Sequence, residues 1–209
     1  MASTTNDSET LFWTACENGQ IEIVKLLLND ERVEVNQANN YNRTPLHIAC
    51  KNGDVEIVKL LLNAERVDIN KGDILGLTPF YIACWYGYIE IVKLILNDQR
   101  VDVNKPNRLG FVPFYVACRE GHIEIVKLLF NDQRVDITKA DNDNLTPFYV
   151  ACGNGRTEIV KLLLNDNRVD INKAEKDGET PFYIACLYGY LEIVKLLLND
   201  QRVDINKVT

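Results

Sequence analysis

The chain repeats one arrangement of apolar and polar positions, and residues 78–105 carry a clear copy of it, TPFYIACWYGYIEIVKLILNDQRVDVNK. A short apolar run begins after Thr78, and the run IEIVKLILN follows Gly87 almost directly. Thr can cap the free amides at a helix start, Pro is tolerated at the first helical position, and Gly can end a helix in the left-handed conformation. The copy therefore predicts two short helices, with Glu90 and Lys93 forming the exposed strip of the second.

This second helix is apolar on nearly all sides, and a helix of its length is not stable alone. Stacked neighbours would cover both of its flanks. The pattern recurs every 34 residues, an interval that the cysteines follow throughout: Cys16, Cys50, Cys84, Cys118, Cys152 and Cys186. A fixed period of this size indicates a solenoid, in which each unit contacts only its neighbours.

We predict an all-α repeat solenoid in which helix-turn-helix units are joined by β-hairpin or turn loops. Its domain covers residues 10–209 and follows a disordered lead-in at residues 1–9. The repeats run approximately over residues 5–38, 39–72, 73–106, 107–140, 141–174 and 175–208. In the connections, residues 101–104 alternate like a short extended segment. Asn97 is expected to take the left-handed position that ends the second helix.

The second copy reads Thr44-Pro45-Leu46-His47-Ile48-Ala49, which matches the ankyrin signature T-P-L-H-x-A. The Gly, EIVKLL and V-D-x-N segments that follow it also resemble the ankyrin consensus, and the resemblance covers residues 10–209 in six copies. It implies an ankyrin repeat array with an unusual period, because typical ankyrin repeats have about 33 residues. Val112 replaces the capping Thr of one copy, which puts the hydrogen bonds of that helix start in question. The signature His becomes another aromatic residue in the remaining copies, and we assign this column to structure: Trp13, Tyr81, Tyr115, Tyr149 and Tyr183.

The charge and hydropathy of the chain exclude several kinds of partner. The net charge of −7 argues against nucleic acid and against an anionic membrane surface, since both attract basic surfaces. No apolar run approaches the roughly 20 residues that a membrane helix needs. We therefore expect no nucleic-acid partner and no membrane partner.

The residues that could carry chemistry lie at unrelated points of the repeat. His47 belongs to the signature and His122 to a turn, so neither completes a nucleophile–base pair, and no phosphate-binding loop occurs. The cysteines form one column at a spacing too wide for disulfides, without the Cys-x-x-Cys spacing of a zinc site. We expect small buried free thiols, a reducing cytoplasmic location, and no enzyme activity, metal, cofactor or small-molecule substrate.

The resemblance implies a protein–protein interaction scaffold that binds its partner on the concave face, through hairpin tips and inner helices. These positions vary between copies while the rest of the repeat barely changes, and repeats 3 and 4 place large apolar residues there. Exposed apolar clusters mark interaction sites, and Trp, Tyr and Arg dominate binding hot spots. The predicted binding surface consists of Ile74, Leu75, Leu77, Trp85, Tyr86, Tyr88, Arg108, Leu109, Phe111 and Arg119.

Trp85 is the strongest single candidate of this surface, and Arg108 and Arg119 form its polar edge. A smaller second candidate consists of Leu187, Tyr188 and Tyr190. The alternative interpretation is that these side chains only pack adjacent hairpins against each other.

Two further hypotheses remain open. The last helix, LEIVKLLL at 191–198, is as apolar as the internal ones. The chain could then be a fragment of a longer array, which we favour, or a monomer that self-associates weakly through its last repeat; Leu197→Lys is expected to disrupt such a dimer. In the third hypothesis the chain is an enzyme's substrate, since some of its asparagines resemble the ankyrin Asn that hydroxylases modify: Asn70, Asn104 and Asn172.

Overall fold

The computed structural model describes residues 11–207, and within that range it contains twelve helices and no strand. The expected lead-in at residues 1–9 lies outside the described residues. The helices are α1 (Leu11–Glu17), α2 (Ile21–Leu28), α3 (Pro45–Asn52), α4 (Val55–Leu62), α5 (Pro79–Tyr86), α6 (Ile89–Asn97), α7 (Pro113–Glu120), α8 (Ile123–Phe130), α9 (Pro147–Gly153), α10 (Thr157–Leu164), α11 (Pro181–Leu187) and α12 (Leu191–Leu198). The all-α repeat architecture expected from the sequence is confirmed.

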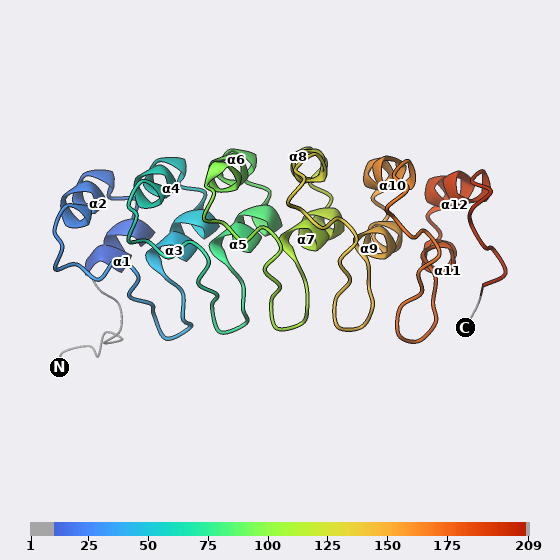
Figure 1. Ribbon diagram of the computed structural model, residues 1–209, viewed down its shortest axis with the longest axis horizontal. Helices are drawn as coiled ribbons and strands as arrows, with labels where there is room; N and C mark the ends of the chain where they lie inside the picture. The colour runs from blue at the N-terminus through green and yellow to red at the C-terminus, as the bar shows by residue number, and fades with distance from the viewer. Residues whose placement is uncertain (1–10, 208–209) are drawn as a thin grey trace. The chain divides into compact units, whose positions relative to one another are not determined.

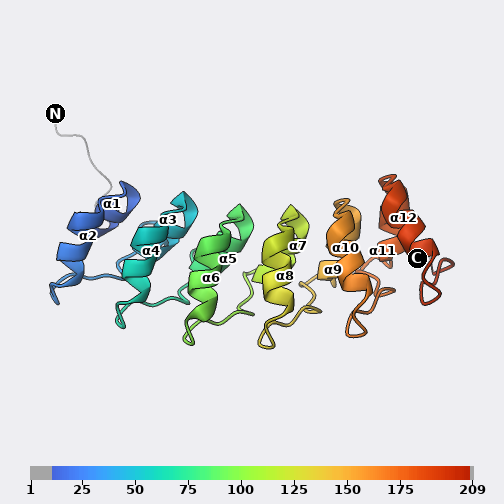
Figure 2. The same cartoon turned by 90° about the horizontal axis from the view of Figure 1, so that it is seen from above.

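The chain divides into two compact units, Met1–Arg108 and Leu109–Thr209. In the first unit α1, α3 and α5 pack side by side as inner helices, and α2, α4 and α6 form a second, outer layer (Figures 1 and 2). In the second unit α7, α9 and α11 are the inner helices, and α8, α10 and α12 are the outer ones. A long loop leads into each inner helix from α3 onward.

Helix α5 begins and ends as the sequence predicts. The Thr78 hydroxyl accepts a hydrogen bond from the Tyr81 amide at 3.1 Å, and Gly87 ends α5 with φ +79°. Val112 makes no side-chain cap, yet α7 still begins at Pro113. Val112 is buried at 1% exposure, so packing compensates for the missing hydrogen bond at this helix start.

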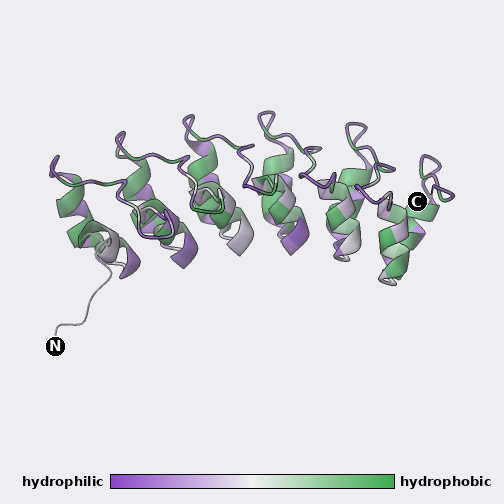
Figure 3. Ribbon diagram, turned by 90° about the horizontal axis from the view of Figure 1, so that it is seen from below, coloured by the Kyte–Doolittle hydropathy of each residue, from purple (hydrophilic) through white to green (hydrophobic). Residues whose placement is uncertain are grey.

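The core of each unit is the contact between successive helix pairs. Figure 3 shows the helices mainly in the hydrophobic colour and the long loops largely in the hydrophilic one.

The cysteines of the first five repeats are buried, and burial raises the pKa of their thiols, that of Cys16 to about 12. Cys186 of α11 is exposed, because no further inner helix covers it within the described chain. All six are free thiols.

The outer helices end differently from the expectation. Asn97 is the last residue of α6, and the residues that follow α2 and α4, Asn29 and Asn63, are right-handed with φ −81° and −70°. The left-handed Asn cap is therefore wrong. Arginines of the following repeat satisfy the helix-end carbonyls instead: Arg66 donates to Leu28 O at 2.9 Å and Arg100 to Leu62 O at 2.7 Å, each across 38 residues. We call this contact the arginine clamp.

A second contact between repeats uses an asparagine in the connection after three of the outer helices, α2, α4 and α10. The Asn70 side chain donates to Arg100 O at 2.7 Å and accepts from the Asp102 amide at 2.8 Å. Asn36 and Asn172 make the same pair of hydrogen bonds to the repeat that follows each of them. These connections are turns, so the extended segment expected at residues 101–104 is not a strand. We call the pair of hydrogen bonds the asparagine bridge.

The fourth repeat lacks this bridge because Thr138 occupies the asparagine position. Its hydroxyl donates to Asp136 at 2.8 Å, within its own turn. A pocket of about 240 Å³ lies beside Thr138 and is lined by Arg168 and Asp170, the residues to which an asparagine would bond. The guanidinium of Arg168 lies 5.5 Å from the centre of the Phe130 ring. The junction between the fourth and fifth repeats therefore uses a ring contact where other junctions use hydrogen bonds.

Restoring the bridge should stabilise the protein. We expect Thr138→Asn to raise the free energy of unfolding by about 1 kcal/mol, because two hydrogen bonds replace one local bond. The reverse change at an intact bridge, Asn70→Thr, should lower it by a similar amount. Urea unfolding followed by circular dichroism measures both, and a destabilised Thr138→Asn variant would contradict the assignment.

Candidate functional site

The predicted binding surface divides between the two units. Ile74, Leu75, Leu77, Trp85, Tyr86, Tyr88 and Arg108 belong to the first unit, and Leu109, Phe111 and Arg119 to the second.

Four aromatic rings of the third repeat form a continuous row in the first unit, which we call the aromatic row. Tyr81 meets Trp85 edge-on at 6.1 Å between ring centres, Trp85 stacks on Tyr86 at 6.1 Å, and Tyr86 stacks on Tyr88 at 6.0 Å. Tyr81 is buried, whereas Trp85 and Tyr86 are 39% and 48% exposed. The row therefore begins in the core and carries two large rings to the surface at the end of α5.

Tyr88 fixes the other end of the row. A Cβ atom built on Gly53 would lie 3.0 Å from the Tyr88 ring, so this ring packs directly on the backbone of the second repeat. Gly53 has φ +79° and ends α3, so its missing side chain serves both the helix end and the ring contact.

The loop tip of the third repeat adds Ile74 and Leu75, which are 40% and 53% exposed. Leu77 is 5% exposed, so its inclusion in the binding surface is corrected: its side chain is part of the core. The loop turns it inward because the buried Asp73 carboxylate accepts hydrogen bonds from the amides of both Leu75 and Leu77, at 2.8 and 3.0 Å. Gly76 supplies the left-handed residue of this turn with φ +81°.

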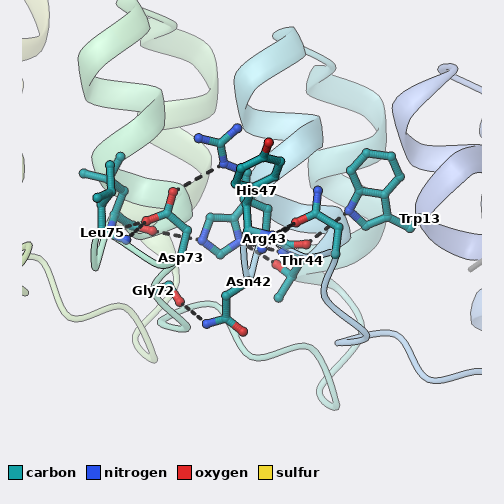
Figure 4. Close-up of polar contacts among 11 residues, drawn as sticks. Trp13, Asn42, Arg43, Thr44, His47, Gly72, Asp73 and Leu75 are labelled. Atoms are coloured by element: carbon teal, nitrogen blue, oxygen red, sulfur yellow. Dashed lines mark hydrogen bonds and ion pairs between the residues drawn. The ribbon is translucent and has the colours of Figure 1, made fainter. Parts of the chain in front are cut away.

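The tip is also tied to its neighbours. The Ile74 amide donates to Tyr41 O at 3.0 Å, and the Arg108 amide donates to Leu75 O at 2.9 Å. Figure 4 shows the Arg43 guanidinium directed at Asp73, with 3.3 Å between Nε and Oδ2. Ile74 and Leu75 therefore project from a loop whose backbone is fixed.

His47 lies beneath this loop and carries a perturbed pKa. Its Nδ1 accepts a hydrogen bond from the Thr44 amide at 3.0 Å, and its Nε2 donates to Leu77 O at 2.9 Å (Figure 4). These partners require the neutral ring with its proton on Nε2. Burial is the main cause that lowers the pKa of His47 to about 4. His47 is therefore a structural residue, as its place in the signature predicts.

The signature column makes the same kind of contact with different residues. Trp13 Nε1 donates to Arg43 O at 3.1 Å, His47 Nε2 donates to Leu77 O, and the Tyr149 hydroxyl donates to Glu179 at 3.1 Å, each across 30 residues. The assignment of this column to structure therefore agrees with its hydrogen bonds.

In the second unit Leu109 is 61% exposed, and the Phe111 ring stacks on Tyr115 at 4.7 Å. The Arg119 guanidinium lies 5.9 Å from the Phe111 ring centre and forms an ion pair with Glu120 at 2.8 Å. Phe111 and Arg119 are thus half-buried in contacts with each other and their neighbours, and Leu109 is the more open member of this group.

The sequence analysis missed a hollow in the second unit. A pocket of about 440 Å³ lies beside Gly153 and Glu179, and it is bordered by Tyr188 and Tyr190 of the smaller candidate. The rings of these two tyrosines are 6.2 Å apart. Its signal in the sequence was a glycine at a position that holds a larger side chain in every other copy.

Residues 11–207 contain no group of three His, Cys, Asp or Glu side chains that could bind a metal ion. None of the helices described is long and apolar enough to span a bilayer.

Comparison with known proteins agrees with this architecture. The family model described as ankyrin repeats (3 copies) matches residues 2–73, 53–141 and 114–209. The chain belongs to the ankyrin repeat family. Ankyrin repeats are generally protein–protein interaction modules. Among solved structures, the chain is similar to EF0377, an ankyrin repeat protein, with 31% identity and a TM-score of 0.83, over 94% of this chain and 99% of that one. A comparison with curated proteins gives no significant match.

His47 makes the stability of this ankyrin array sensitive to acid. The unfolded chain binds a proton near pH 6.5 and the folded chain only near pH 4, so stability is complete above pH 6.5 and falls as the pH drops toward 4. Between pH 7.5 and pH 5 the loss should be about 2 kcal/mol. Replacing His47 with Tyr, the residue of the later repeats, should remove most of this loss.

Urea unfolding of wild type and His47→Tyr at both pH values measures the difference. The aspartates paired with arginines have lowered pKa values and respond only at more acidic pH, so they do not mask it. An equal loss in both proteins would contradict the role assigned to His47.

Proposed function

We propose that the chain is a non-catalytic binding module that attaches a partner protein through the third repeat. The contact surface consists of the aromatic row from Trp85 to Tyr88 and the loop tip of the same repeat: Ile74, Leu75, Trp85, Tyr86 and Tyr88. The observation that carries the proposal is the exposure of Trp85 and Tyr86, the two middle rings of a row whose end rings, Tyr81 and Tyr88, are packed.

Packing within the array does not require these rings at the surface. The positions of Trp85 and Tyr86 hold Lys51 and Asn52 in the second repeat, and α3 forms an equivalent inner helix there. A rigid aromatic ring loses little conformational entropy on binding and buries a large area, which is why Trp and Tyr are frequent hot spots. The ring stack and the fixed loop tip hold these side chains in place before binding, which lowers the entropy lost when a partner binds.

The test is affinity capture from a lysate of the source organism with wild type and a Trp85→Ala/Tyr86→Ala variant. We expect a protein that wild type retains and the variant loses, with binding weakened at least about 30-fold, because two hot-spot rings contribute roughly 2 kcal/mol or more. The isolated pair is then measured by calorimetry.

Leu26→Ala is the matched control, because Leu26 is 71% exposed but lies on the outer helix α2. It should retain the partner as wild type does. Circular dichroism must show unchanged helix content in both variants. Equal retention by the double variant would refute the proposed surface.

A second candidate function, self-association through the last repeat, has its own observation. Leu191 and Leu198 of α12 are 62% and 54% exposed. Leu197 is 1% exposed, so the sequence-based choice of Leu197→Lys as a test is corrected: a charge there would disrupt the core.

Self-association is tested with Leu191→Lys/Leu198→Lys in sedimentation equilibrium over a 100-fold concentration range of about 1–100 μM. A dimer in wild type that is absent in the variant supports this function. A wild-type monomer at every concentration removes it.

A further inference from the structure

One column of the inner helices has a gap in the second unit. The residue after each repeat's cysteine is, in order, Glu17, Lys51, Trp85, Arg119, Gly153 and Leu187. Only Gly153 has no side chain there, and it is the last residue of α9. The pocket of about 440 Å³ described above opens where the other copies have this side chain.

Tyrosines from successive repeats line the hollow together with Leu145 and Ile184. Tyr149 is buried on the inner side, while Tyr188 is 60% exposed at the rim and lies next to the half-buried Tyr190. A Cβ atom on Gly155 would lie 2.6 Å from the Tyr190 ring, so this ring is fixed against the backbone of the fifth repeat. Four tyrosines, Tyr115, Tyr149, Tyr188 and Tyr190, thus supply much of the wall.

A single carboxylate, that of Glu179, lies in this aromatic lining. Its Oε2 accepts the hydrogen bond from the Tyr149 hydroxyl at 3.1 Å, and its amide donates to Glu175 Oε1 at 3.0 Å, which fixes the loop that carries it. Burial and the nearby Glu179 both raise the pKa of Tyr149, so this hydroxyl keeps its proton and remains a donor. Among residues 11–207 no cation forms an ion pair with Glu179.

The loops beside the hollow are acidic as well. Asp143 and Asp177 are exposed, and Asp177 lies in the same loop as Glu175 and Glu179. Lys176 of this loop lies 3.7 Å from Asp143. The hollow is therefore a half-buried, negatively charged pocket with aromatic walls.

We infer that this hollow receives a lysine or arginine side chain of a partner protein. A cation over aromatic faces is attracted by their quadrupoles, and a carboxylate in the same wall forms a charge-assisted hydrogen bond with it. A neutral apolar side chain would cover the Glu179 carboxylate without pairing it, and an anionic one would be repelled by it. This inference goes beyond the proposed function, because the hollow and the aromatic row belong to different units and are tested separately.

The experiment is a titration of the full ¹⁵N-labelled chain with three probes: Nα-acetyl-lysine amide, Nα-acetyl-arginine amide and the neutral Nα-acetyl-norleucine amide. At least one cationic probe should shift the amide signals of Gly153, Asn154 and Glu179, and norleucine at the same concentration should not. The lysine and arginine arms show which of the two side chains fits better. Glu179→Gln keeps an acceptor for the Tyr149 hydroxyl but removes the charge, and should weaken binding at least about fivefold.

Two variants complete the design. Gly153→Leu introduces the residue of the sixth repeat and should abolish the shifts; its Cβ would lie 3.3 Å from Ile184, so an unchanged melting temperature is required first. Asp177→Asn removes an equal charge from the exposed loop outside the pocket lining and should leave binding within about twofold. Equal binding of norleucine, wild-type affinity in Glu179→Gln, or no shift with either cation would overturn the inference.

Discussion

No helix in the described chain is longer than nine residues, so each depends on contacts with the next repeat. The signature position shows how that dependence is met. An indole, an imidazole and a phenol, from Trp13, His47 and Tyr149, each donate a hydrogen bond to the repeat that follows. The position requires an aromatic side chain with a hydrogen-bond donor that reaches a residue 30 positions later, and Trp, His and Tyr all meet this requirement. The acceptors, Arg43, Leu77 and Glu179, each stand two residues before an inner helix, so these bonds hold the end of the long loop that leads into it.

Local chemistry in the sequence predicted the parts of the fold that depend on neighbouring residues. The Thr78 hydroxyl caps the start of α5, and Gly87, which has no side chain, ends it in the left-handed conformation. The outer helix ends could not be predicted in this way, because their carbonyls are satisfied by an arginine 38 residues further along. The prediction of Leu77 at the surface is wrong for a different, local reason: its position before Thr-Pro varies between copies, but its amide bonds to the buried Asp73 four residues earlier.

The candidate surfaces show the same division. The large residues of the aromatic row stand out in the sequence, and the structure leaves Trp85 and Tyr86 exposed among them. The hollow beside Gly153 depends on an absent side chain, which a search for hot-spot residues passes over. Its carboxylate also belongs to a position where other copies carry Arg43, Leu77 or Phe111, so only the spatial arrangement brings Glu179 and Tyr149 together. The position after the cysteine holds Trp85 in the third repeat and Gly153 in the fifth, so the same backbone carries an exposed ring at one repeat and a pocket at another.

The arginine clamp has a direction, and this gives synthesis of the chain an order. Arg66 completes the end of α2, and Arg100 completes the end of α4, so each outer helix is finished by residues translated later. While a nascent chain leaves the ribosome, its newest outer helix has open carbonyls until the next repeat has emerged. At these two junctions the earlier repeat is therefore complete only once its successor has been made.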